Sequence, residues 1–136
     1  MAGWREFVSV AVGAVVGTGL RLTLDTVIPH TDTEFPLSTL LINVVGSFAL
    51  GALSSTLWRR PSLPNWVKTG LGAGTIGSFT TFSALMVSLV AETSDGLGML
   101  ALGYLVLSLV LGFGAALVGL SLGRRRMPRP SELVDE

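Results

Sequence analysis

A run of small and hydroxyl-bearing residues lies inside one apolar stretch of this chain, between positions 70 and 83, where the sequence is GLGAGTIGSFTTFS. Glycine weakens a helix, and inside a membrane a broken helix is tolerated only where it is buried in protein or lines a wet cavity. A break also frees backbone carbonyl oxygens, which can bind a small cation. Glycine equally lets neighbouring helices pack closely, and the spacing alone leaves both interpretations open.

The preceding apolar stretch carries one strongly polar side chain, Asn43. Thr39, Asn43 and Ser47 are spaced four residues apart, so they share one face of a helix. A buried amide between two hydroxyls can donate hydrogen bonds to an anion, or it can join two helices structurally. Phe79 and Phe82, three residues apart, can likewise face an anion with their electropositive ring edges or simply pack.

Arg21 and Tyr104 are further polar side chains within apolar stretches. An arginine inside a membrane is costly unless it reaches water or pairs, and Asp25 follows Arg21 by one turn. Arg21 can form a salt bridge, extend its side chain to the membrane surface (snorkel) or attract anions, and the sequence does not decide among these roles. The hydroxyl of Tyr104 needs a partner in the protein or in a pore.

The chain has no cysteine and a single histidine, and its apolar stretches lack paired carboxylates. Hydrolysis, redox chemistry and phosphoryl transfer need such groups. We therefore expect no enzyme and no catalytic residue. The formal net charge is zero, so no nucleic-acid partner is expected.

Four apolar stretches must position these side chains, at about 7–28, 37–58, 66–91 and 97–122. Each has the length that spans a bilayer, about 20 residues. Only 13% of the residues are charged, against about a quarter in soluble domains. The sequence predicts an all-α integral membrane protein with four transmembrane helices, the third broken at the Gly/Thr-rich segment. Residues 1–123 form one domain, and residues 124–136, basic and then acidic, form a tail that we expect to be disordered.

The basic residues are distributed asymmetrically. Eight of the nine lysines and arginines fall on one side of the predicted membrane, and only Arg21 does not. The positive-inside rule then predicts a multi-pass protein of the cell membrane with both termini in the cytoplasm. The eight residues are Arg5, Arg59, Arg60, Lys68, Arg124, Arg125, Arg126 and Arg129. The opposite side carries Asp25, Asp32, Glu34, Glu92 and Asp95.

Pairs of glycines four residues apart, Gly13 with Gly17 and Gly119 with Gly123, predict close packing of helices or of subunits. Four short helices enclose little of a pathway by themselves, so we expect the chain to form an oligomer.

Three motifs together resemble the Fluc/CrcB family of fluoride-specific channels. They are GTGLR at 17–21, PLSTLLINVVGSF at 36–48 and GTIGSFTTFS at 74–83, and they extend over most of the predicted spans. The resemblance implies that the domain 1–123 is a channel for passive export of fluoride, which lowers the cytoplasmic fluoride concentration. It also implies an antiparallel dimer with two narrow pores, each built from both subunits.

The resemblance assigns roles to residues by position. It makes Asn43, Phe82, Ser83 and Tyr104 candidates for lining the pore, and Thr39, one turn from Asn43, belongs with them. It assigns the backbone carbonyls of Gly77 and Thr80 to a structural sodium ion that is not transported, in accord with the preference of hard cations for oxygen ligands. For Arg21, which ends the first motif, we expect a structural role.

Three positions depart from the family pattern. Ala84 stands where a hydroxyl is usual, Leu85 where a second phenylalanine is usual, and Ser88 where a glutamate is usual. A homodimer would lack these groups in both pores. The one-sided charge also favours a single orientation in the membrane. We therefore favour a heterodimer with an oppositely oriented homologous subunit over a homodimer.

Two alternatives are weighed against a conducting subunit. A non-conducting accessory subunit is compatible with Leu85 and Ser88. A small four-helix proton-coupled exporter needs a carboxylate near the middle of its first span, and none lies between Phe7 and Leu24.

Overall fold

The computed structural model describes residues 3–28 and 35–125. Within these residues the protein is all-helical and contains no strand, and four helical segments are long and apolar enough to span a membrane. The predicted fold class is therefore confirmed. The first, second and fourth spans are centred on α1 (Trp4–Val27), α2 (Leu37–Ser55) and α6 (Gly98–Arg125). A short 3-10 turn, η1 (Leu57–Arg59), follows α2.

The third span is built from four pieces, and together they are longer than the predicted 66–91. They are α3 (Asn65–Thr69), the π-helical segment η2 (Gly70–Ile76), α4 (Gly77–Phe79) and α5 (Phe82–Ser94). The glycine-rich part does not break the span. It winds instead as a wide π-helix, a rare form that often marks a functional site. The break comes after it, at Thr80 and Thr81, whose backbones are extended.

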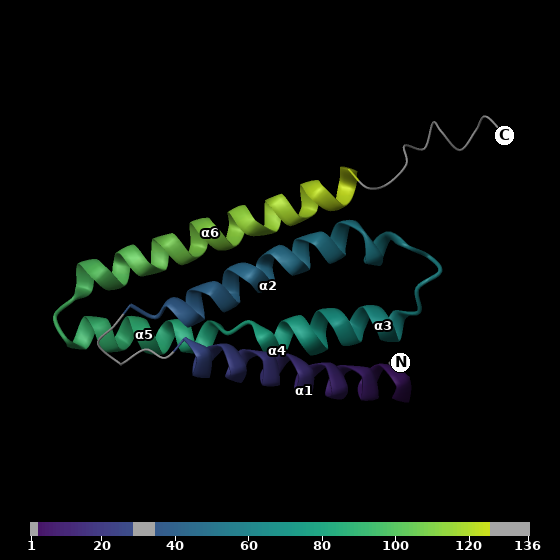
Figure 1. Cartoon of the computed structure of the whole chain (residues 1–136), viewed down its shortest axis with the longest axis horizontal. Coiled ribbons are helices and arrows are strands. Elements are labelled where there is room, and N and C mark those ends of the chain that lie inside the picture. Colours follow the sequence, from purple (N-terminus) through teal and green to yellow (C-terminus); the bar gives the residue numbers. More distant parts are fainter. Residues whose placement is uncertain (1–2, 29–34, 126–136) are drawn as a thin grey trace.

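The spans run along one long axis (Figure 1). The N-terminal end of α1, the connection from α2 to α3 and the C-terminal end of α6 lie at one end, and the connection from α5 to α6 lies at the other. We call the first the basic end, because the described residues Arg5, Arg59, Arg60, Lys68 and Arg124 belong to the segments that lie there, and the second the acidic end, because Glu92 and Asp95 are beside the connection from α5 to α6. Arg126, Arg129, Asp32 and Glu34 are outside the described residues, as is most of the predicted tail, although α6 continues through Arg125.

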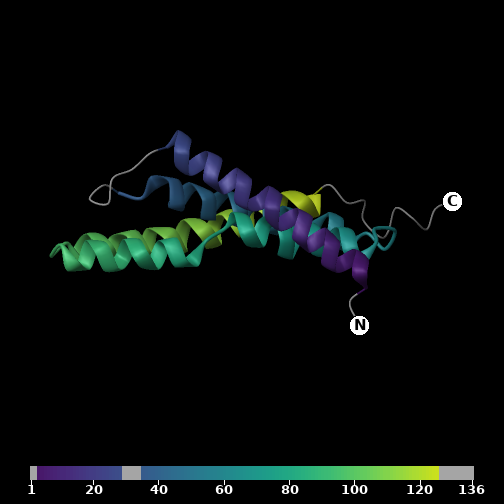
Figure 2. The same ribbon diagram turned by 90° about the horizontal axis from the view of Figure 1, so that it is seen from below.

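The third span changes neighbours at its break. Before the break, α3, η2 and α4 pack along α1, whereas after it α5 packs along α6. Figure 2 shows α1 diverging from α5 while α5 stays beside α6. The extended residues Thr80 and Thr81 therefore redirect the chain from one partner helix to another.

Glycine makes the contact between α1 and the third span possible. A methyl group added at Gly13 would collide with the carbonyl oxygen of Gly70, and one added at Gly17 would collide with Ser78 and Thr75. The Ser78 hydroxyl donates to the Ala14 carbonyl at 3.1 Å. The close packing predicted for Gly13 and Gly17 therefore occurs between helices of one chain.

The contact between α2 and α6 follows the same rule. A methyl group at Gly119 would collide with the Phe48 carbonyl, and one at Gly123 would collide with the Ser55 hydroxyl. Ser55 is 1% exposed, and its hydroxyl lies 3.4 Å from the Gly119 carbonyl. The second predicted glycine pair therefore also joins helices within the chain.

The buried core is small and lies toward the acidic end. Leu40, Leu85 and Tyr104 form its centre, and Phe35 packs edge-on against Tyr104 with ring centroids 5.1 Å apart. Large apolar side chains elsewhere on the helices are mostly exposed. This is the arrangement expected of a protein whose outer surface faces lipid or another subunit.

Candidate functional site

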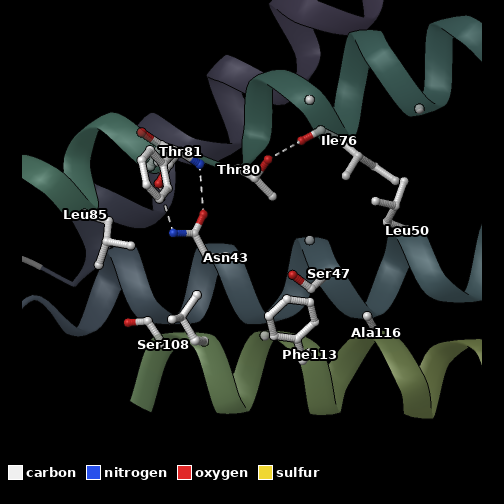
Figure 3. Close-up of a pocket in the computed structure, with 16 residues that line it drawn as sticks. Asn43, Ser47, Leu50, Ile76, Thr80, Thr81, Leu85, Ser108, Phe113 and Ala116 are labelled. Carbon is white, nitrogen blue, oxygen red and sulfur yellow. Dashed lines mark hydrogen bonds between the residues drawn. The ribbon is translucent and has the colours of Figure 1, made fainter. Parts of the chain in front are cut away.

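The break in the third span is held by Asn43 of α2 (Figure 3). The side-chain amide of Asn43 donates to the Thr81 carbonyl at 2.9 Å, and its oxygen accepts from the Thr81 amide at 2.8 Å. Both backbone groups of an extended, 8% exposed residue are thereby satisfied by one side chain. The Asn43 side chain thus satisfies the backbone donor and acceptor of Thr81, as a neighbouring strand would in a sheet.

The helix that follows the break is capped by the same threonine. The Thr81 hydroxyl accepts from the Ala84 amide at 3.2 Å, which is the N-cap hydrogen bond of α5. In a continuous helix the amides of Thr81 and Ala84 would instead donate to the carbonyls of Gly77 and Thr80. The break therefore deprives these two carbonyl oxygens of their helical donors.

The glycine at position 46 brings the break against α2. The methyl group of Thr80 occupies the space that a side chain at Gly46 would fill. The Thr80 hydroxyl donates back to the Ile76 carbonyl at 3.0 Å, closing the preceding turn. Asn43 and Gly46 thus position the break together, one by hydrogen bonding and the other by close approach.

A cavity of about 430 Å³ lies between α2, the broken third span and α6. Its walls contain amide, hydroxyl and aromatic groups but no charged side chain. The α2 wall consists of Asn43, Gly46, Ser47 and Leu50. The wall from the third span consists of Gly72, Ile76, Gly77, Thr80, Thr81, Phe82 and Leu85. The α6 wall consists of Ser108, Leu109, Gly112, Phe113 and Ala116.

Three of the five predicted pore residues lie together at the break. Asn43 and Phe82 line the cavity, and the Phe82 side chain is 68% exposed. The Ser83 hydroxyl lies 3.2 Å from the Thr81 hydroxyl. This part of the chain therefore presents an amide, an aromatic ring and two hydroxyls within a short distance of one another.

Thr39 and Tyr104 do not line this cavity. Both are buried, and Tyr104 packs in the core toward the acidic end, where its hydroxyl lies 3.5 Å from the Pro36 carbonyl. The single chain thus separates Thr39 and Tyr104 from the group around Asn43. Their roles in a pore stay predictions.

Two of the three departures from the family pattern, Leu85 and Ser88, occupy different environments. Leu85 is 4% exposed and lies between the cavity and the core, in contact with Leu40 and Tyr104. The Ser88 hydroxyl is used within its own helix, where it donates to the Ala84 carbonyl at 3.1 Å. Neither side chain offers a free polar group to the cavity.

Arg21 is half-buried on α1. Among residues 3–28 and 35–125 no ion pair or hydrogen bond engages its guanidinium, so the salt bridge with Asp25 that the spacing allowed does not form. The snorkelling and anion-attracting interpretations both stay open, and the structural role stays a prediction.

Two residues at the site, Thr81 and Ser108, were not predicted from the sequence. Thr81 was quoted only as part of a motif, yet its backbone and hydroxyl organise the break. Ser108 of α6 lines the cavity, and its hydroxyl is buried. The spacing of Ser108, four residues after Tyr104, is the signal that could have identified it.

Within the described part of the chain no group of three or more histidine, cysteine or acidic side chains could hold a metal ion. Any ion at the site must therefore interact with backbone carbonyls, hydroxyls, amides or ring edges. A multi-pass membrane protein with a broken helix and an uncharged, partly polar cavity is suited to passing ions rather than to transforming substrates.

The chain belongs to the CrcB family, because residues 8–120 match the family described as "CrcB-like protein, Camphor Resistance (CrcB)". It is 44% identical over 115 residues to a fluoride-specific ion channel FluC of Deinococcus radiodurans, covering 85% of this chain and 89% of the relative. It is 37% identical over 114 residues to FluC 2 of Geobacillus kaustophilus, covering 83% and 88%. It is 38% identical over 116 residues to FluC of a Chelativorans species, covering 85% and 93%.

Proposed function

We propose that this chain is a subunit of a fluoride-specific channel that lets fluoride leave the cell passively. Membership of the CrcB family and relatives named as fluoride-specific channels support this function. The structural observation that carries it is the cavity beside the break, which combines an amide, hydroxyls and phenylalanine edges and has no charged side chain. Such walls attract an anion without trapping it as a fixed positive charge would.

Asn43 combines two tasks in this proposal. One of its two amide hydrogens is used by the Thr81 carbonyl. An asparagine amide has two donors, so the second remains for fluoride. The hydrogen bonds to Thr81 fix the amide in place, and a fixed donor loses little entropy when an anion arrives. Phe82 and Ser83 complete the path, with Thr39 and Tyr104 further along it.

We also propose the structural sodium ion at the break. Its ligands in this chain are the carbonyl oxygens of Gly77 and Thr80, which lose their helical donors when the Thr81 and Ala84 amides bind elsewhere. Oxygen ligands of this kind suit a hard cation. Hard cations take about six oxygens, so two carbonyls leave the ion incomplete. A second subunit supplying the same pair therefore fits the donor count better than a single chain.

An antiparallel dimer is the assembly that we propose, and a heterodimer is favoured over a homodimer. The Phe82 and Phe113 side chains at the cavity are 68% and 70% exposed, so a path for an ion needs a covering partner. A partner that retains the second phenylalanine and the glutamate would provide what Leu85 and Ser88 do not. The basic end faces the cytoplasm in this proposal, in keeping with the positive-inside rule.

One observation favours a second candidate, a non-conducting accessory subunit. Leu85 belongs to the chain's own core and the Ser88 hydroxyl bonds within its helix, so neither contributes a ligand to a pore. In that case this chain would only hold a conducting partner in its active form.

Fluoride efflux from liposomes, measured with a fluoride electrode, tests both candidates. The chain is reconstituted alone, with its homologue, and with the homologue after Phe82→Ile in this chain. Efflux only from the mixture, reduced by Phe82→Ile, supports a heterodimer in which this chain lines a pore. Efflux that Phe82→Ile leaves unchanged supports the accessory role. Absence of fluoride-selective efflux from every mixture contradicts the proposed function.

A further inference from the structure

A groove lies between α1 and the first part of the third span, toward the basic end, and the proposed channel function gives it no role. Its volume is about 700 Å³, which is within the range of about 300 to 1,000 Å³ that is typical of ligand sites. Figure 1 shows α1 and α3 side by side where the groove begins. The groove shares no lining residue with the cavity beside the break, so the two lie on different faces of the third span.

The groove runs along the helices rather than across them. On α1 it follows one face at four-residue spacing, through Trp4, Val8, Val12 and Val16. The distance from Trp4 to Val16 along a helix is about 18 Å, slightly more than half of the hydrocarbon thickness of a bilayer, about 30 Å. The opposite wall begins at Trp66 and continues to Thr75. The groove therefore has the length and the direction of one leaflet of a membrane.

The walls of the groove are apolar and open to the side. The Val12 side chain is 59% exposed, although it lies in the middle of the α1 wall. The two hydroxyl groups of the walls are used by the backbone: Ser9 donates to the Glu6 carbonyl at 2.8 Å, and Thr75 donates to the Gly70 carbonyl at 3.3 Å. A polar ligand would lose its hydrogen bonds with water along such walls, whereas a hydrocarbon chain would not.

A positive charge lies at the basic end of the groove. Arg5 lines the groove, with its guanidinium carbon 5.9 Å from the centroid of the Trp4 ring. Among residues 3–28 and 35–125 no ion pair engages Arg5, and the neighbouring Glu6 does not line the groove. Basic pockets between transmembrane helices bind anionic lipid headgroups. The charge therefore favours an anionic occupant over a neutral one.

The aromatic residues place this end of the groove at the membrane surface. Trp4 and Trp66 both line it near Arg5, in the first turns of α1 and α3. Tryptophan in membrane proteins is enriched at the level of the lipid headgroups. The groove thus extends from the headgroup level toward the middle of the bilayer.

A second copy of the chain is a less suitable occupant than a lipid. The exposed rings of Phe82 and Phe113 belong to the face that a partner subunit would cover, and they line the cavity rather than the groove. A partner on that face leaves the groove, on the other face of the third span, in contact with the bilayer.

We propose that the groove between α1 and the third span binds an anionic phospholipid of the leaflet at the basic end. One acyl chain lies along Val8, Val12 and Leu71, and the phosphate of the headgroup accepts hydrogen bonds from the Arg5 guanidinium. The bound lipid contacts both helical elements, so it stabilises the packing of α1 against the part of the third span that precedes the break.

The test is quenching of tryptophan fluorescence by phospholipids with brominated acyl chains. The full chain is reconstituted in phosphatidylcholine vesicles, and a rising fraction of the lipid is replaced by brominated phosphatidylglycerol or by brominated phosphatidylcholine. Trp4 and Trp66, two of the three tryptophans in the chain, line the groove, so their emission reports the lipid that occupies it. Phosphatidylglycerol should bind with an apparent affinity about fivefold higher than phosphatidylcholine, the effect of about one arginine near a membrane surface.

Two pairs of variants separate a site from a general surface effect. Arg5→Gln should reduce the preference for phosphatidylglycerol to less than about twofold, whereas Arg60→Gln, which lies at the same end but outside the groove, should retain it. Val12→Phe fills the groove and should also remove the preference. Val15→Phe is its control, because Val15 is exposed on α1 and does not line the groove.

Equal quenching by the two lipids in the unaltered chain overturns the proposal, as does a preference that Arg5→Gln and Val12→Phe leave unchanged. Loss of the preference to the same extent in Arg60→Gln or Val15→Phe also overturns it, because the effect then belongs to the whole surface. Quenching by both lipids that increases as the protein is diluted in the membrane shows a second copy in the groove and contradicts a lipid site. The measurement requires no fluoride flux, so its result is independent of the channel function.

Discussion

Replacing Asn43 by alanine tests whether one side chain holds the break in the third span. The substitution removes hydrogen bonds of 2.8 and 2.9 Å and leaves the buried backbone of Thr81 without partners. Hydrogen bonds between helices in membrane proteins contribute about 0.6 kcal/mol on average and at most about 1.7 kcal/mol. With two of them lost, we expect the free energy of unfolding to fall by about 1 to 3.5 kcal/mol.

The assay is reversible unfolding in bicelles, combined with amide hydrogen exchange at the break. In Asn43→Ala the Thr81 and Ala84 amides should exchange faster, because the Thr81 amide donates to Asn43 and the Thr81 hydroxyl accepts from the Ala84 amide at the start of α5. Asn43→Asp keeps the acceptor for the Thr81 amide but loses the donor to its carbonyl, so its loss should be intermediate. Ser47→Ala is the matched control, because Ser47 lines the same cavity one turn further along α2.

Ser47→Ala should change the unfolding free energy by less than about 0.5 kcal/mol, as is usual for a substitution that breaks no buried hydrogen-bond network and leaves no cavity in the core. If Asn43→Ala and Ser47→Ala were equally mild and exchange at Thr81 stayed slow, the break would be held by packing alone. The conclusion that the Asn43 hydrogen bonds hold the break would then be wrong.

Substitutions at Gly17, Tyr104 and Leu85 test the packing around the site. Gly17→Val should separate α1 from the third span and lower the free energy of unfolding by about 1 to 3 kcal/mol or more, because the new side chain overpacks the contact. Gly19→Ala is the control, because a side chain at Gly19 meets open space, and it should lower the free energy by less than about 0.5 kcal/mol. Chemical unfolding measures both. Tyr104→Phe should lower stability by less than about 1 kcal/mol because the hydrogen bond from its hydroxyl to the Pro36 carbonyl is 3.5 Å long, and Tyr104→Ala by about 3 to 5 kcal/mol, in the same assay. Leu85→Phe adds volume to a 4% exposed position and should destabilise the isolated chain by about 1 to 3 kcal/mol; an increase in its thermal stability would contradict this packing.

The spans were predictable because an uninterrupted apolar run of bilayer length has few other interpretations. The asymmetry of Arg5, Arg59, Arg60 and Lys68 likewise placed them at one end of the molecule, as the structure confirms. The extent of the third span was less predictable. Its first residues, Asn65 to Thr69, are helical despite their polarity because they continue a helix packed along α1.

The residue types at the site were predictable from the sequence, but the hydrogen bonds between them were not. The sequence marked Asn43 and the Gly/Thr-rich segment, and it left open whether the amide binds an anion or another helix. Its hydrogen bonds to Thr81 join residues 38 positions apart, and no local spacing rule predicts such a pair. The break also falls at the threonines rather than the glycines, because the glycines are held against α1 and stay helical.

The change of neighbour in the third span has a consequence for biosynthesis. A membrane protein is made from its N-terminus, and α1 can meet α3, η2 and α4 soon after these emerge. The main partner of both α2 and α5 is α6, the last helix to be synthesised. Its 28 residues take roughly one to six seconds to make at common translation rates. During that interval the faces of α2 and α5 that α6 will cover stay exposed, so a chaperone or insertase has most to protect just before α6 is inserted.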